Sequence, residues 1–329
     1  MADNSKILVI IPCLNEELYL EKLVQHLEAS NNSPNMHIII VDGGSTDQTP
    51  DIGRKLAHDK SNIHYIENPK RIQSAAINCA VATFGGDAEF LIRIDAHADY
   101  PKHYCDILID EATATKADSI VVSMHTVGKT PFQKAAALAQ NSKLGNGGSA
   151  HRMIDATMDV GGRWVDHGHH ALIRIAAFQN VGGYDETFTH NEDAELDMRL
   201  NQKDYKIWLT SKTSLTYYPR ATPFALFKQY MNYGYGRACT LFKHSVRPKL
   251  RQLLPALVAP AALLALATPV ISMAALPLVA WILLCLGYSS ISAIKAKDPS
   301  ILLMGFAAMI MHFSWSLGFW KAMLTRAIK

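Results

Sequence analysis

The sequence predicts an α/β fold, a mostly parallel sheet flanked by helices, followed by a C-terminal transmembrane helical segment. Ile38 to Val41 is a run of four β-branched residues, and such runs without alternation are typical of strands that are buried on both faces of a parallel sheet. Strand patterns then alternate with amphipathic helical patterns along the first half of the chain. The C-terminal part is different, because the 42 residues from Leu253 to Ile294 contain no Asp, Glu, Lys or Arg.

The elements follow one another in a regular order. Asn15 is expected to cap the first helix, because Leu20, Leu23, Val24 and Leu27 recur on one face after it. We expect residues 161–163 to form a loop. The predicted strands are 6–11, 37–41, 63–66, 90–94 and 119–124, and further helices are predicted at about 47–57, 73–83 and 192–203.

Polar side chains follow three of these strands. Pro12 to Glu16 comes after the first strand, Asp42 to Asp47 after the second, and Asp95 to His97 after the fourth. Ligands of open α/β sheets bind at the carboxyl ends of the strands. A carboxylate there can accept hydrogen bonds from a base imide or a ribose hydroxyl, although Asp42 also suits a tight turn and Asp47 a helix cap.

Asp95 and His97 form a candidate metal site. Two ligands separated by one residue lie on the same side of an extended chain, where they can hold a divalent cation against a diphosphate. The alternative for His97 is an ordinary histidine of a surface loop.

The composition excludes several classes of protein. The first 243 residues carry a net charge of −4, so nucleic acid is not expected as a partner. There is no G-x-G-x-x-G dinucleotide fingerprint, and the sequence around Gly128 is not a P-loop. The five cysteines form no C-x-x-C pair and are expected to be reduced thiols in the cytoplasm.

The hydrophobic C-terminal region is expected to span the membrane with two to three helices. A bilayer core needs about 20 apolar residues per helix, and residues 300–320 add a second uncharged stretch; buried core helices are the alternative. Residues 223–243 alternate aromatic and basic residues, which predicts an interfacial segment. The predicted division is therefore a catalytic domain at 1–222, an amphipathic interfacial segment at 223–252 and a membrane region at 253–329. Basic residues flanking the first hydrophobic block favour a cytoplasmic catalytic domain.

Five segments carry a resemblance to a known family. PCLNE, VDGGSTDQT, NPKRIQSAAINCA, RIDAHADYP and GGYDETFTHNEDAELDMRL, in this order, resemble family 2 glycosyltransferases with the Rossmann-like GT-A fold. The DAH triplet and VDHGHHALIR are similar to the succinoglycan-type bacterial exopolysaccharide glucosyltransferases. The resemblance covers roughly residues 5–240.

The resemblance implies a nucleotide-sugar site in the first part of the chain. Pro12, Asn15 and Glu16 would contact the uridine. Asp42 would read the uracil, and Arg71 would lie beside the nucleotide.

The resemblance also implies a divalent cation, Mn²⁺ or Mg²⁺. Asp95 matches the first residue of the family's DxD motif, whereas His97 stands where the second aspartate is usual. Because imidazole suits Mg²⁺ less well than carboxylate does, this departure favours Mn²⁺.

Asp193 aligns with the catalytic base of the family. A carboxylate in the first turn of a helix can take the proton of an acceptor hydroxyl, although Glu192, Asp193 and Glu195 would stabilise that helix end in any case. Asp197 is expected to partner Arg199 or a nearby backbone group. The acceptor or diphosphate side of the site is assigned to His169, His170 and Glu192, with a purely structural role as the alternative for either histidine.

Together these features imply an inverting hexosyltransferase of the inner membrane. We expect it to move glucose from UDP-glucose onto a sugar linked to a polyprenyl diphosphate, with membrane lipid and other polysaccharide-assembly proteins as partners. Three alternatives stay open. They are a polyprenyl-phosphate sugar synthase, a processive polysaccharide synthase, and an inactive membrane protein that binds nucleotide sugars.

Overall fold

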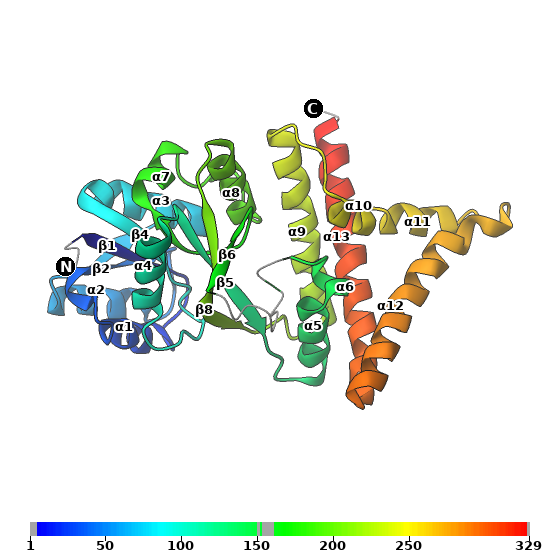
Figure 1. Cartoon of the computed structure of the whole chain (residues 1–329), viewed down its shortest axis with the longest axis horizontal. Helices are drawn as coiled ribbons and strands as arrows, with labels where there is room; N and C mark the ends of the chain where they lie inside the picture. The colour runs from blue at the N-terminus through cyan, green and yellow to red at the C-terminus, as the bar shows by residue number, and fades with distance from the viewer. Residues whose placement is uncertain (1–4, 150–151, 153–160, 328–329) are drawn as a thin grey trace. The chain divides into compact units, whose positions relative to one another are not determined.

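The computed structural model describes residues 5–149, 152 and 161–327. The chain divides into two compact units (Figure 1). The first consists of Met1–Met124 and Asp155–Thr216, and the second of His125–Ile154 and Tyr217–Lys329.

An eight-stranded sheet organises the fold, with the strand order β3-β2-β1-β4-β7-β5-β8-β6. Strands β3, β2, β1 and β4 are parallel to one another, whereas β7 runs antiparallel to β4 and β5, and β6 antiparallel to β8. The mostly parallel half of the sheet therefore comes from the first part of the chain. The strands are β1 (Lys6–Cys13), β2 (Met36–Asp42), β3 (Ile63–Glu67), β4 (Ala88–Arg93), β5 (Ser119–Thr126), β6 (Gly162–Val165), β7 (His169–Arg174) and β8 (Ile207–Tyr217).

Helices cover this sheet and bury its apolar side chains. Helix α3 packs on β1 and β2, α2 on β3, and α7 on β4. The core includes Leu8, Ile10, Ile39 and Leu91, each at most 1% exposed. The helices of this unit are α1 (Leu20–Glu28), α2 (Thr49–Asp59), α3 (Gln73–Phe84), α4 (Tyr104–Thr115), α7 (Ile175–Asn180) and α8 (Glu192–Gln202).

The five predicted strands are present, but two local predictions were wrong. Helix α1 begins at Leu20 rather than at Asn15, and its N-cap residue makes no side-chain capping bond. Asn15 instead adopts a left-handed conformation, with φ of 58°, and its Oδ1 accepts from the backbone N–H of Thr46. Residues 162 and 163, expected in a loop, belong to strand β6.

The second unit is a set of helices packed around α13. Figure 1 shows α9 and α13 side by side along much of their length, and α5 also contacts α13. Ala135, Ala136 and Ala139 of α5 are buried with Ala307 and Met311 of α13. The helices are α5 (Pro131–Asn141), α6 (Lys143–Asn146), α9 (Pro223–Lys243), α10 (Leu250–Ala256), α11 (Val258–Ala265), α12 (Leu276–Ala296) and α13 (Leu303–Ala327).

Two glycines allow α9 and α13 to approach closely. A Cβ atom added at Gly234 would lie 1.9 Å from the carbonyl oxygen of Trp315, and one added at Gly318 would lie 1.8 Å from that of Met231. Any side chain at either position would therefore force the helices apart.

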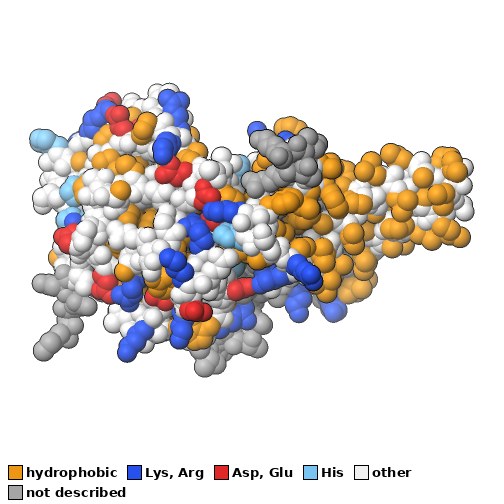
Figure 2. Space-filling model, turned by 90° about the horizontal axis from the view of Figure 1, so that it is seen from above, with side chains coloured by type: hydrophobic (Ala, Val, Ile, Leu, Met, Phe, Trp, Pro, Cys, Tyr) orange, Lys and Arg blue, Asp and Glu red, His pale blue; other side chains and the backbone are white. Residues whose placement is uncertain are grey.

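Two helical stretches of the described chain, Ser272–Ala296 and Pro299–Thr325, are long and apolar enough to cross a membrane. Only 17% of the apolar window of the first is buried inside the protein, and Figure 2 shows hydrophobic side chains covering the end formed by α11 and the start of α12. Residues 250–265 form the two short helices α10 and α11 instead of a third long helix. An apolar surface of this kind fits a lipid environment.

Candidate active site

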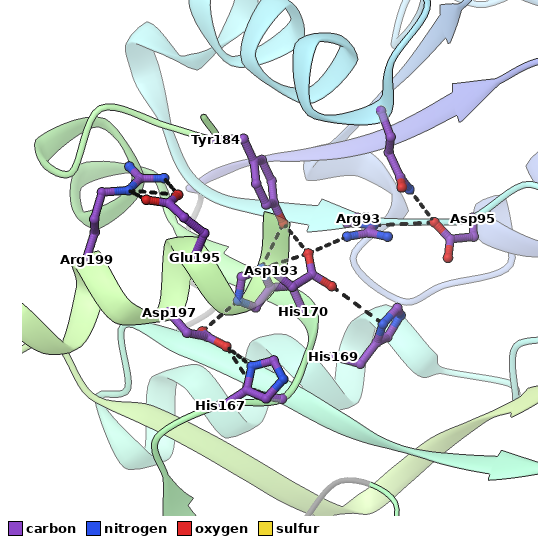
Figure 3. Close-up of polar contacts among 12 residues, drawn as sticks. Arg93, Asp95, His167, His169, His170, Tyr184, Asp193, Glu195, Asp197 and Arg199 are labelled. Atoms are coloured by element: carbon purple, nitrogen blue, oxygen red, sulfur yellow. Dashed lines mark hydrogen bonds and ion pairs between the residues drawn. The ribbon is translucent and has the colours of Figure 1, made fainter. Parts of the chain in front are cut away.

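Arg93 joins the two halves of the predicted site. It is the last residue of β4, and only 7% of its side chain is exposed. Its Nη1 donates to Asp193 Oδ1 at 2.7 Å, and its Nε lies 3.4 Å from Asp95 Oδ1 (Figure 3). One buried guanidinium therefore holds the strand-end carboxylate and the helix carboxylate together.

The charges in this group support one another. Burial lowers the pKa of Arg93, but Asp193 and Asp95 outweigh that effect and raise it well above its usual value. Burial alone would raise the pKa of Asp193, but Arg93 and His170 have the larger combined effect and lower it. The carboxyl group is therefore strongly held in its ionised form. Burial alone would raise the pKa of Asp95, but Arg93, His169 and His97 together outweigh burial and lower it.

The two oxygens of Asp193 have different surroundings. Oδ1 contacts Arg93, the Tyr184 hydroxyl at 3.1 Å and His170 Nδ1 at 3.5 Å. Oδ2 lies 3.9 Å from His169 Nδ1. The side chain is 18% exposed. Of its two oxygens, Oδ2 has fewer polar contacts than Oδ1.

Glu192 precedes Asp193 at the first position of α8 and is half-buried. Burial and the neighbouring Asp193 raise the pKa of Glu192 to about 7. At neutral pH this carboxyl group therefore exchanges its proton readily, unlike Asp193.

A buried histidine–aspartate cluster lies behind Asp193 (Figure 3). Asp197 is 1% exposed; its Oδ1 lies 2.7 Å from His170 Nε2, its Oδ2 lies 2.6 Å from His167 Nδ1, and it also accepts from the backbone N–H of Gly168. The expected backbone partner is confirmed, but the expected pairing with Arg199 is wrong. Arg199 pairs with Glu195 four residues earlier.

Asp42 ends β2 and is 3% exposed. Its carboxylate accepts from the backbone N–H groups of Gly44 and Ser45, from the Ser45 hydroxyl, and from the Tyr65 hydroxyl at 3.3 Å. Asp42 therefore has the turn-forming contacts that were its alternative interpretation. They also hold the carboxylate rigidly at the carboxyl end of its strand.

The other residues of the predicted nucleotide side surround this turn. The Asn15 N–H donates to Ser45 Oγ at 2.8 Å, and a Cβ atom at Gly44 would lie 3.1 Å from Arg71 Nε. Pro12 lies in β1 one residue before Cys13, which is paired with Asp42 in register. These side chains, predicted separately from three loops, are neighbours.

The two candidate cation ligands have different partners. His97 is 69% exposed, and its Nδ1 lies 2.8 Å from Glu16 Oε1. Asp95 Oδ1 accepts from Gln73 at 2.8 Å. No group of three or more His, Cys, Asp or Glu side chains within the described residues is arranged to hold an ion. One carboxylate and one imidazole fit a cation that takes its other ligands from a bound diphosphate.

Sequence reasoning missed Arg93, Gln73, Tyr184 and His167. Only Arg93 left a visible signal, since it is the single charge inside the apolar run FLIRI before Asp95. A charge buried in a strand needs a partner, and the partner, Asp193, is 100 residues away in sequence.

Comparison with known proteins shows the family to which the chain belongs. The family model described as glycosyl transferase family 2 matches residues 8–182, and the model described as glycosyl transferase family group 2 matches residues 135–324. The chain is also 53% identical over 317 residues to the succinoglycan biosynthesis protein ExoA of Rhizobium meliloti (strain 1021), covering 96% of this chain and 94% of that protein. The chain is a family 2 glycosyltransferase. The resemblance carried by the sequence motifs is confirmed.

Two more distant proteins are similar to this glycosyltransferase. A Methanococcus voltae dolichyl N-acetyl-α-D-glucosaminyl phosphate 3-β-D-2,3-diacetamido-2,3-dideoxy-β-D-glucuronosyltransferase is 25% identical over 247 residues, covering 71% of this chain and 74% of that protein. The mannosyltransferase PcManGT from Pyrobaculum calidifontis, solved with GDP-Man and Mn²⁺, has a TM-score of 0.61 at 17% identity, covering 99% of this chain and 89% of that chain. The second likeness confirms the GT-A fold of the glycosyltransferase.

Proposed function

We propose that this glycosyltransferase moves a hexose, glucose from UDP-glucose, onto a sugar carried by a polyprenyl diphosphate lipid in exopolysaccharide synthesis. The observation that carries the proposal is the carboxylate of Asp193. It lies in the first turn of α8, and Arg93 and Tyr184 hold its Oδ1 while Oδ2 is less engaged. This arrangement suits a base that acts on an acceptor hydroxyl.

The proposed reaction is a single displacement with inversion. Asp193 Oδ2 takes the proton of the acceptor hydroxyl while that oxygen bonds to the anomeric carbon of the sugar. The bond from this carbon to the diphosphate oxygen breaks, and its electron pair leaves with the nucleoside diphosphate. An α-linked donor thus gives a β-linked product.

The donor side of the site supports a uridine nucleotide. Asp42, fixed by Ser45 and Tyr65, would accept from the uracil imide, with Asn15 and Arg71 alongside. Asp95 and His97 would hold a divalent cation, Mn²⁺ or Mg²⁺, which would neutralise the charge that develops on the departing diphosphate. His169 and Glu192 would line the acceptor or diphosphate side, whereas His170, which is 1% exposed and bonded to Asp197, lies too deep to line it.

The names of two relatives support the choice of acceptor. One relative is a succinoglycan biosynthesis protein, and the name of the other describes transfer to a sugar on a dolichyl phosphate. The apolar helices Ser272–Ala296 and Pro299–Thr325 would hold the enzyme in the inner membrane, with its catalytic domain at the cytoplasmic surface. A lipid-linked acceptor and other polysaccharide-assembly proteins are available at that surface.

The test is a panel of nucleotide sugars incubated with the full-length enzyme and a membrane extract, followed by nucleoside diphosphate release. UDP-glucose is expected to give the highest rate, with one sugar added per acceptor. A ladder of products would instead indicate a processive synthase, and no turnover with any donor or divalent cation would indicate an inactive binding protein.

A second experiment separates the proposal from a polyprenyl-phosphate sugar synthase, in which a lipid phosphate attacks without a base. Asp193→Asn is expected to lower kcat by several hundredfold, within the roughly 10² to 10⁴ range of general base catalysis. Asp110→Asn, on the exposed surface of α4, is the matched control and should leave kcat unchanged. Full activity of Asp193→Asn would contradict a hydroxyl acceptor.

A further inference from the structure

A continuous chain of hydrogen-bonding groups leads from Asp193 into the protein interior (Figure 3). Asp193 Oδ1 lies 3.1 Å from the Tyr184 hydroxyl, which lies 2.7 Å from His170 Nδ1. On the other side of the ring, His170 Nε2 lies 2.7 Å from Asp197 Oδ1. His170 and Asp197 are each 1% exposed. The chain therefore continues behind the carboxylate, away from solvent.

This chain of groups matters because Asp193 is a weak base and cannot keep the proton that it takes from the acceptor. Arg93 holds the pKa of Asp193 far below its usual range, although burial alone would raise it. A carboxylic acid of that kind gives up an acquired proton quickly. With both sugars bound and water displaced, the nearest acceptor behind Oδ1 is the oxygen of Tyr184.

The donors and acceptors along the chain permit only two arrangements. An ionised Asp197 has no proton to give, so His170 Nε2 must donate to it. With a neutral ring, Nδ1 accepts from the Tyr184 hydroxyl. With a protonated ring, Nδ1 donates to Tyr184, and the hydroxyl turns to donate to Asp193. Moving one proton along the chain converts the first arrangement into the second.

We propose that Tyr184 and His170 relay the acceptor proton from Asp193 to the buried His170–Asp197 pair. The inference rests on the proposed role of Asp193 as base. The proton taken at Oδ2 comes to face Tyr184 when the Asp193 carboxyl group turns about its Cβ–Cγ bond. It then passes to the Tyr184 oxygen while the Tyr184 hydrogen moves to His170 Nδ1. Asp193 returns to a carboxylate, His170 becomes an imidazolium ion facing Asp197, and no other group changes. After product release the proton returns along the same path to solvent.

The charges around His170 support its role as the final acceptor. Asp193 and Asp197 face it from α8, Arg93 from β4, and Tyr184, His167 and His169 complete its ionisable surroundings. Burial lowers the pKa of His170, but Asp197 and Asp193 outweigh that effect and raise it above the usual value. The imidazolium form is thus accessible, whereas Arg93 and burial lower the pKa of the adjacent His169 to about 4.

The experiment compares Tyr184→Phe, His170→Gln and the double variant in full-length enzyme in membranes. Each single variant is expected to lower kcat about a hundredfold, with the KM for the donor unchanged. Because the two residues act in one chain, the double variant should be no slower than the slower single one. His58→Gln, an 89% exposed histidine on α2, is the matched control and should keep full activity.

The pH dependence of kcat distinguishes a relay from a purely structural role of His170, because a structural role would leave it unchanged. The relay needs neutral His170, so wild-type kcat should rise with pH through the raised pKa of His170, above about 6.5. In His170→Gln that rise of kcat with pH should disappear. Tyr184→Phe keeps the His170–Asp197 pair, but it should lose the solvent deuterium effect on kcat that the relay gives the wild-type enzyme.

Two results would overturn the relay. One is an unchanged pH profile in His170→Gln, and the other is a double variant whose loss is the product of the two single losses. Both results count against the relay once the separate Asp193→Asn variant has been shown to lose several hundredfold in kcat. If Asp193→Asn is active instead, the proposed function itself fails, so the two failures are distinguishable.

Discussion

Arg93 donates to Asp193 at 2.7 Å while its Nε lies 3.4 Å from Asp95, so one buried cation compensates two site carboxylates. In the proposed reaction, Asp95 belongs to the donor side and Asp193 to the acceptor side. Arg93 thereby fixes the spacing of the two sides from the end of β4, without being a ligand of either substrate.

Arg93→Met is expected to destabilise the protein by about 3 kcal/mol at pH 7, because it leaves two partly buried carboxylates without their cation. The depressed pKa values of Asp193 and Asp95 contribute stability above pH ~4, and that contribution is lost as the pH falls. The deficit of the variant should therefore shrink as the pH falls below about 4. Thermal unfolding at pH 7 and at about pH 3 measures both effects. Arg54→Met, which breaks only exposed ion pairs, should cost less than about 1 kcal/mol; an equal cost for the two variants would contradict the bridging role.

Asp42→Asn is expected to raise the KM for the donor about tenfold or more, since a charged hydrogen bond contributes roughly 1.5–3 kcal/mol. The kcat should stay within about twofold, because Asp42 is remote from the bond that breaks. Tyr65→Phe removes a single 3.3 Å contact to the same carboxylate and is the control, with a small effect on either constant. Steady-state kinetics with varied donor decide this, and a fall confined to kcat would count against a base-reading role.

His97→Ala is expected to weaken cation-dependent nucleotide binding, and His97→Asp to shift the preference from Mn²⁺ towards Mg²⁺, since carboxylate oxygen suits Mg²⁺ better than imidazole does. Calorimetric titration of UDP with and without each cation measures this independently of turnover. His58→Ala serves as the control. Identical cation dependence in all variants would exclude His97 as a ligand.

Gly318→Ala is expected to destabilise the second unit by about 1–3 kcal/mol, because the new methyl group would lie 1.8 Å from the Met231 carbonyl oxygen and overpack the α9–α13 contact. Gly287→Ala provides a matched helix glycine with no atom within 4 Å of the added Cβ. It should be neutral or slightly stabilising, since alanine favours helices by about 1 kcal/mol over glycine. Thermal unfolding in detergent compares the pair, and equal melting temperatures would contradict the close helix contact.

Sequence predicted well the features that depend on local pattern. The run of β-branched residues before Asp42 predicts a strand with the carboxylate at its end, and the helix predicted at about 192–203 is α8. Asn15 was assigned as a cap because it precedes an apolar helical pattern, but a contact with Thr46 from another loop determines its conformation. Strand β6 is only four residues long and pairs with β8, so its own sequence carries no periodic signal.

Contacts between segments far apart in the sequence could not be predicted from local sequence patterns. Arg93 and Asp193 are separated by 100 residues, and His170 meets Asp197 only because β7 inserts antiparallel beside β4 and brings its histidines towards α8. Single-sequence reasoning identified the individual carboxylates and histidines. It had no means to tell which of them meet.

Helix α5 has a consequence for making a soluble form of this enzyme. Its Ala135, Ala136 and Ala139 are buried against Ala307 and Met311 of α13, although α5 lies within the predicted catalytic domain, before Asp193 in the chain. A protein ended at residue 222 retains α5 and loses α13, so that apolar face meets water and favours aggregation. Removing the membrane helices therefore calls for polar replacements on α5 as well, since the hydrophobic surface does not begin where the hydrophobic sequence does.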